Sequence, residues 1–124
     1  AVYFIKAFAP RLFCRIRNHF GLSYEAFVRC LEQDQGGYYQ SGDFFFTSRS
    51  HVVFKQIQQS DVKVILSVLE AYSHHIRDNP FSLLPHWYSI VHIRTPGLGA
   101  RFFLVTNNVL HTVDSIDAIY DIKG

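Results

Sequence analysis

The chain has 124 residues, of which 48% are hydrophobic and 18% are charged, and 12 basic against 10 acidic residues give a net charge of +2. This length allows one domain or part of one, with enough apolar side chains for a packed core. The basic residues are dispersed and no recognition motif accompanies them, so the sequence argues against nucleic acid as a partner. The apolar runs are too short to cross a bilayer.

The two cysteines, Cys14 and Cys30, fall in separate predicted helices. This usage favours free thiols in a reducing, intracellular compartment over a disulfide. The chain begins at Ala1, has no signal peptide and contains no methionine. These features predict an excised segment of a longer protein.

The N-terminal part has the pattern of two short helices. Between Lys6 and Phe20 apolar residues recur at helical spacing, Pro10 suits the first turn, and Gly21 ends the helix. Ser23 is a suitable N-cap for the second helix, whose apolar stripe comprises Tyr24, Phe27, Val28 and Leu31.

Residues 36–57, GGYYQSGDFFFTSRSHVVFKQI, predict a glycine-containing loop followed by an antiparallel hairpin. The three phenylalanines at 44–46 favour the first strand. In the second strand, alternation places Val53, Lys55 and Ile57 on one face. Lys55 therefore interrupts an apolar row, and its ammonium group must either reach water or meet an anion.

This hairpin has two interpretations. A glycine loop over phosphates, followed one strand later by a lysine that binds them, is the arrangement that kinases use. A plain hairpin whose lysine extends to solvent has the same pattern. The spacing alone does not decide between them.

Residues 60–76 predict the longest helix, with Ser60 as N-cap, Asp61 in the first turn, and an apolar stripe at Val62, Ile65, Val68, Leu69, Tyr72 and Ile76. Near its end, His74 and His75 are adjacent. Adjacent helical residues point in different directions, which argues against a shared metal ion.

After Leu83-Leu84-Pro85, residues 87–94 and 101–106 predict two antiparallel strands joined by a turn that contains proline and glycine. Asn107 and Asn108 then form an ordinary turn or expose backbone groups in a cleft. Together the elements predict an α+β fold, in which an antiparallel sheet carries two N-terminal helices and one long helix packed on the sheet.

The chain ends in YDIKG, Tyr120 to Gly124, and carries upstream AFAPRLFCRIRNHFGLSYEAF, SGDFFF, VVFKQI, SDVKVILSVLEAYSHHI, SLLPHWY and FFLVTNNV. In this order the segments resemble the phosphatidylinositol phosphate kinases, lipid kinases that phosphorylate the inositol ring of phosphatidylinositol monophosphates. The closing segment is similar to that family's Y-D-L-K-G-S signature. The others resemble its N-terminal helices, glycine loop, lysine strand, long helix, Leu-Leu-Pro segment and hinge. The resemblance covers nearly the whole chain.

The resemblance implies that residues 1–124 form the N-terminal lobe of such a catalytic domain and bind ATP. Lys55 would hold the α- and β-phosphates, and Ser41 and Gly42 would belong to the loop above them. Val53 would pack on the adenine ring.

The hinge implied by the family runs from Val105 to Val109 and includes Asn107 and Asn108; its backbone would bond the adenine edge. Asp61 stands where the family carries the acid that orients the lysine, whereas Glu70 is closer to the spacing in protein kinases. A solvated aspartate at the helix start is the alternative for Asp61.

The resemblance also implies an activity for the parent protein: transfer of the ATP γ-phosphate to the ring of a phosphatidylinositol monophosphate, giving a bisphosphate. The parent would be cytoplasmic and peripheral at a membrane surface that carries the phosphoinositide. Mg²⁺ would be the cofactor, held by residues outside this segment in the missing C-terminal lobe. We therefore expect the segment alone to be inactive, and its uncovered apolar face could support a homo-oligomer.

Two positions depart from the family pattern. Asp43 stands where a small hydroxyl residue is usual, and its carboxylate would repel phosphates. Ser89 replaces a glycine. Asp43 raises the alternative that the parent is a degenerate kinase acting as a regulatory or scaffolding interaction module. The segment does not specify which ring position is phosphorylated.

Overall fold

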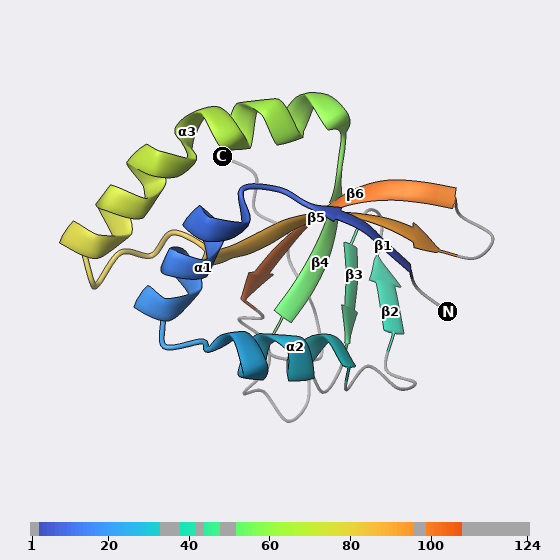
Figure 1. Ribbon diagram of the computed structural model, residues 1–124, viewed down its shortest axis with the longest axis horizontal. Helices are drawn as coiled ribbons and strands as arrows, with labels where there is room; N and C mark the ends of the chain where they lie inside the picture. Colours follow the sequence, from blue (N-terminus) through green and yellow to red (C-terminus); the bar gives the residue numbers. More distant parts are fainter. Residues whose placement is uncertain (1–2, 33–37, 42–43, 48–51, 96–98, 108–124) are drawn as a thin grey trace.

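The computed structural model describes residues 3–32, 38–41, 44–47, 52–95 and 99–107 (Figure 1). The described strands are β1 (Tyr3–Ala7), β2 (Tyr38–Ser41), β3 (Phe44–Thr47), β4 (Val52–Ile57), β5 (Trp87–Thr95) and β6 (Gly99–Asn107). The described helices are α1 (Pro10–His19), α2 (Tyr24–Glu32) and α3 (Gln59–Asp78).

The strands form one six-stranded sheet in the order β1-β5-β6-β4-β3-β2, and each neighbouring pair is antiparallel. The predicted α+β fold is therefore confirmed, with two helices ahead of the central hairpin and one long helix packed on the sheet. The predicted β3–β4 hairpin and the β5–β6 pair are also confirmed.

Helices cover both faces of the sheet (Figure 1). On one face, α1 and α3 bury a core against β5 and β6 that comprises Phe13, Ile16, Val62, Leu69, Tyr72, Ile76, Ile90 and Leu104. On the other face, α2 packs on a second core that comprises Phe27, Cys30, Val52, Tyr88, Val91, Ile93, Phe103 and Val105. The alternation predicted for β4 agrees with this division, because Ile57 contacts the first core and Phe54 the second.

The N-terminus differs from its prediction. Pro10 opens α1, as predicted, but the apolar pattern that was read from Lys6 as helical starts in a strand, because Tyr3–Ala7 forms an edge strand paired with β5. Proline disfavours helical backbone in the residue before it and suits the first helical position. Ala9, between β1 and α1, turns the chain with a left-handed backbone at a φ of 43°. The strand β2 was likewise not predicted, because its glycine-rich approach indicated only a loop.

The end of α1 and the start of α2 lie at the residues predicted to end and to cap them. Gly21 has a φ of 75°, a conformation that glycine adopts without strain. Ser23 caps α2, since its Oγ accepts a bond of 3.1 Å from the Ala26 N–H. Tyr24, expected in the apolar stripe, is instead 63% exposed, because it lies in the first turn of α2, which presents Phe27 to the core. Cys14 and Cys30 are not joined in a disulfide, as predicted.

Ser60, which was predicted to be the N-cap of α3, is not the cap in the structure. Gln58 is the N-cap, and it forms a capping box in which its own N–H donates to Asp61 Oδ2 at 2.9 Å. Because the helix begins two residues earlier than expected, Asp61 occupies its third position. In the stripe, Val68 is 44% exposed, whereas Leu69 beside it is buried, so the stripe is narrower than predicted.

A bulge in β5 is held by a buried arginine. The register of β5 against β6 shifts between Trp87 and Ser89, which takes the Tyr88 carbonyl out of the regular ladder. Arg17 Nη1 donates to this carbonyl at 2.7 Å, and the guanidinium lies 4.6 Å from the centre of the Phe27 ring. Burial lowers the pKa of Arg17. Arg17 thus joins α1 to the sheet between the two cores.

Candidate functional site

Lys55 lies on the face of the sheet that α1 and α3 cover, in the middle of β4. It stands directly opposite Leu104 on β6 and Phe44 on β3, and Phe44 in turn stands opposite Ser41 on β2. Directly opposed residues of antiparallel strands share a face. Ser41, at the end of β2, is therefore in the same row as Lys55, two strands and about 10 Å away.

A concave site of about 440 Å³ adjoins Lys55. It lies between β4, the start of α3 and β6, and its lining includes Lys55, Gln58, Asp61, Ile65 and Leu104. Lys55 is exposed although Leu104, directly opposite it on β6, is buried. The arrangement places an ammonium group and a carboxylate at one hollow, whose wall is partly apolar through Ile65 and Leu104.

The two candidate acids on α3 fall in different places. Asp61 lines the hollow beside Lys55 and also completes the helix cap through Oδ2. Glu70 lines a separate groove between α1 and α3. Nine residues separate the two acids, which corresponds to about 13 Å along a helix axis.

The predicted hinge residue Asn107 forms two hydrogen bonds with His86. Its backbone N–H donates to the His86 carbonyl at 3.2 Å, and its Oδ1 accepts from the His86 N–H at 3.0 Å. The His86 ring stacks on Phe20 with 3.7 Å between ring centres. Burial, and secondarily the charge of His19, lowers the pKa of His86. These bonds fix the end of β6 beside the start of β5.

Val53 is half-buried and stands opposite Thr106, next to the hinge. It shares the face of Lys55, as the alternation predicted. Of the other predicted site residues, Gly42, Asn108 and Val109 lie outside the described residues, as does Asp43. For Ser41 the structure gives the backbone and its register only. Ser89, the other departure from the family pattern, is buried at 4% exposure.

Sequence reasoning missed Gln58 and Leu104 as lining residues. The sequence does contain a pattern that could have identified Gln58: it precedes Asp61 by three residues, which is the spacing of a capping box. No sequence pattern could have identified Leu104, because its position opposite Lys55 depends on the register between two strands that are far apart in the sequence.

The histidine pair diverges as expected. His74 lines the groove against α1, whereas His75 contacts Ser82 through Nε2 at 3.1 Å and approaches Asn79. Among the described residues, no cluster of histidine, cysteine, aspartate or glutamate could hold a metal ion. No helix in the described ranges combines the length and apolar character needed to span a bilayer.

Comparison with known proteins identifies the family. A family model described as "Phosphatidylinositol-4-phosphate 5-Kinase" matches residues 30–124. The chain belongs to this family. The resemblance seen in the sequence motifs is thereby confirmed, and with it the assignment to the lipid kinases of the phosphatidylinositol phosphate kinase group.

Named relatives of this lipid kinase family align along most of the chain. Phosphatidylinositol 4-phosphate 5-kinase its3 of Schizosaccharomyces pombe is 29% identical over 127 residues, covering 96% of this chain and 17% of the relative. Phosphatidylinositol 4-phosphate 5-kinase type-1 beta of Gallus gallus is 29% identical, covering 96% of this chain and 23% of the relative. A probable phosphatidylinositol phosphate kinase of Dictyostelium discoideum is 32% identical over 82 residues, covering 65% and 11%. The chain thus spans less than a quarter of these relatives.

Proposed function

We propose that residues 1–124 are the N-terminal lobe of a lipid kinase catalytic domain. The whole protein would transfer the γ-phosphate of ATP to the inositol ring of a phosphatidylinositol monophosphate and give a bisphosphate. The observation that carries the proposal is the position of Lys55, which lies at a hollow shared with Asp61 and in the cross-strand row of Ser41. Family membership supplies the class of reaction.

In this proposal Lys55 binds the α- and β-phosphates of ATP. The hollow fits that role, because Ile65 and Leu104 exclude water from part of it, and a cation beside apolar groups interacts with an anion more strongly than one surrounded by water. Ser41 and Gly42, at the connection from β2 to β3, would bring backbone N–H groups over the phosphates. ATP supplies the phosphoryl group, and these residues bind and orient it.

Val53 would contact the adenine ring, because it is half-buried on the face of Lys55 and lies next to the start of the hinge. Asn107 has its backbone N–H and side-chain oxygen bonded to His86. Its role would therefore be to fix the hinge, and Asn108 and Val109 would supply the backbone groups that bond adenine.

Asp61 is the better candidate for the acid that orients Lys55, because the two side chains line one hollow and Glu70 lines another. Only Oδ2 is used in the helix cap, and a carboxylate can accept bonds at both oxygens. Asp61 would thus complete the cap of α3 and position the lysine at the same time.

The remaining parts of the reaction belong to the parent protein. Mg²⁺, which prefers carboxylate oxygens, would be held by a C-terminal lobe that this chain does not include. That lobe would also carry the residues that act on the transferred phosphate, so the 124-residue chain alone should be inactive. The parent would work in the cytoplasm at a membrane surface containing the phosphoinositide. Self-association of the chain would use the apolar surface that the other lobe covers.

A Lys55→Met substitution in the complete kinase tests this function. We expect phosphorylation of phosphatidylinositol monophosphate in vesicles to fall by at least about a hundredfold, the scale of losing one charge stabiliser. Folding stability should stay within about 0.5 kcal/mol, because Lys55 is exposed. Lys63→Met, an exposed lysine of α3 outside the hollow, is the matched control and should retain activity. Unchanged activity in Lys55→Met would show that the lysine only extends to solvent.

A further inference from the structure

Tyr72 joins α3 to the start of β5. Its hydroxyl donates to the Pro85 carbonyl at 2.6 Å and accepts from the Trp87 N–H at 2.9 Å. Its ring stacks on the Trp87 ring with 4.3 Å between ring centres, and the side chain is buried at 7% exposure. Because a hydroxyl can donate and accept at once, one side chain of α3 pairs two main-chain groups where β5 begins.

The residue between these two partners is bonded to the predicted hinge. The main chain of His86 accepts a bond from the Asn107 N–H and donates one to Asn107 Oδ1. Three consecutive residues therefore alternate between two neighbours, since Pro85 and Trp87 bond to α3 and His86 bonds to the end of β6. Through this segment, Tyr72 connects α3 to the end of β6.

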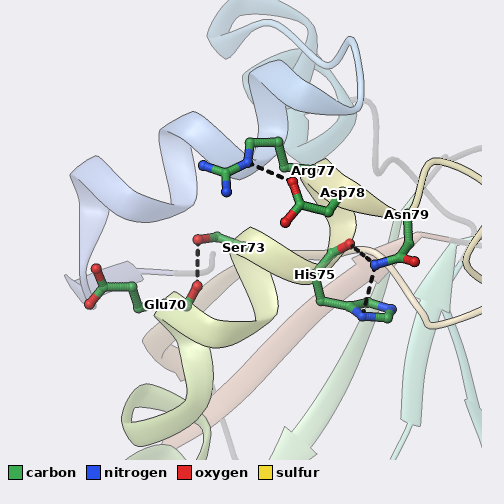
Figure 2. Close-up of polar contacts among 6 residues, drawn as sticks. All are labelled: Glu70, Ser73, His75, Arg77, Asp78 and Asn79. Carbon is green, nitrogen blue, oxygen red and sulfur yellow. Dashed lines mark hydrogen bonds and ion pairs between the residues drawn. The ribbon is translucent and has the colours of Figure 1, made fainter.

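Other polar contacts in the C-terminal half of α3 are local to the helix. Figure 2 shows the Ser73 hydroxyl donating to the Glu70 carbonyl at 2.8 Å, and the Asn79 side chain donating to the His75 carbonyl at 2.9 Å. The ion pair in the same view joins two neighbouring residues of α3. These contacts stabilise the helix and its C-terminal cap, whereas the bonds of Tyr72 fix the helix on the sheet.

The geometry of α3 relates Tyr72 to the hollow at Lys55. Eleven residues separate Asp61 from Tyr72, which is close to three whole helical turns, so the two project from nearly the same side of α3. A rotation of α3 about its axis would therefore move Asp61 through the same angle as Tyr72. Apolar packing is not directional, whereas the two hydrogen bonds of Tyr72 require a particular geometry. They define the rotation of the helix.

We infer that Tyr72 is a positioning residue for the nucleotide site, because it fixes the rotation of α3 and thereby holds Asp61 beside Lys55. Tyr72 does not itself line the hollow. In the proposed function Asp61 orients Lys55, and this role of Tyr72 rests on that proposal. Loss of the hydroxyl would leave the main-chain bonds between His86 and the hinge in place. It would therefore disturb the orientation of the phosphates more than the binding of adenine.

The test is Tyr72→Phe in the complete kinase, which keeps the ring on Trp87 and removes only the hydroxyl. Tyr88→Phe is the matched control. Tyr88 is buried to a similar extent, at 8% exposure, but belongs to the core beneath α2, and its hydroxyl faces the His86 ring at 3.4 Å. We expect Tyr72→Phe to lower kcat about tenfold, the scale of a displaced positioning group, with KM for ATP changed by less than about threefold. The control should keep both constants. Activities are measured below the unfolding temperature of the least stable variant.

A double-variant comparison separates positioning from a general loss of stability. If Tyr72 acts through Asp61, adding Tyr72→Phe to Asp61→Asn should lower kcat no further, whereas independent effects would multiply. Multiplying losses, an unchanged kcat in Tyr72→Phe, or an equal loss in Tyr88→Phe would overturn the inference. Lys55→Met is assayed alongside, and its loss of activity shows that such an outcome concerns Tyr72 alone. Full activity of Lys55→Met would instead contradict the proposed function, and the role of Tyr72 with it.

Discussion

Arg17 carries a guanidinium group into the protein interior, at 7% exposure, without a carboxylate partner among the described residues. What holds it there is the Tyr88 carbonyl, freed at the β5 bulge, together with the face of Phe27. Its Nε is buried without a hydrogen-bond partner within the described part of the chain. The arginine therefore stabilises a local irregularity of the sheet at a substantial desolvation cost.

Replacing Arg17 by alanine should lower the free energy of unfolding by about 2–4 kcal/mol, because the substitution leaves the Tyr88 carbonyl unpaired and opens a space beside Phe27. Urea denaturation of the 124-residue chain measures this. Arg11→Ala, at an exposed position on the same helix, should change the free energy by less than about 0.5 kcal/mol. Equal effects in the two variants would mean that the bond to Tyr88 contributes nothing.

His86 should make stability depend on pH. Its pKa is lowered in the folded chain by burial and by His19, so the unfolded chain takes up the proton first as the pH falls. The stabilising contribution of neutral His86 is therefore complete above about pH 6.5, the ordinary histidine pKa. It is lost as the pH falls from there through the lowered pKa of the folded state.

His86→Phe removes this titration while a ring remains to stack on Phe20. Urea unfolding at a series of pH values should show a decline below about pH 6.5 that is steeper in the original chain than in the variant. Parallel profiles would contradict the role of His86. The two bonds that the main chain of His86 forms with Asn107 are unaffected by the substitution.

At the scale of elements, sequence patterns located the helices and the central strands but not all of their boundaries. Apolar periodicity placed α1 and α3 because these helices bury a stripe. It missed β1, because an edge strand of five residues pairs with β5, which lies far away in the sequence. It misplaced the α3 cap because Gln58 is not among the commonest cap residues, although its spacing to Asp61 is that of a capping box.

The capping box gives Asp61 a measurable structural role. Asp61→Ala should destabilise the chain by about 1 kcal/mol, because the Gln58 N–H loses its acceptor. Ser60→Ala, at the position first expected to cap, should have little effect, since Ser60 is not the N-cap. Asp61→Asn retains an acceptor oxygen and should keep most of the stability. Thermal or urea unfolding of the three variants checks these expectations, and a larger loss for Ser60→Ala would contradict them.

The same variants separate capping from positioning. If Asp61 orients Lys55, the complete kinase with Asp61→Asn should lose activity while it stays folded, because the neutral amide attracts the ammonium group less. If Asp61 only caps α3, Asp61→Asn should leave activity nearly unchanged.

At the scale of the whole molecule, the candidate site is assembled by the sheet. Sequence alternation put Lys55 on an apolar face, and the resemblance proposed a role for it. The contact of that lysine with the hollow at Asp61 depends on how α3 packs beside β4 and β6. The cross-strand row from Ser41 to Leu104 depends on three registers. Neither can be read from local sequence, because register is a property of paired strands.

Binding of Mg-ATP to the complete catalytic domain tests the central claim that Lys55 lies in a nucleotide site. We predict that the nucleotide raises the thermal unfolding temperature, with about 2.7 kcal/mol of stabilisation when its concentration is 100 times the dissociation constant, and that Lys55→Met removes most of the effect. Failure of millimolar Mg-ATP to stabilise the unsubstituted domain would contradict the account and favour the alternative, in which Asp43 marks a degenerate kinase lobe that serves as a scaffold.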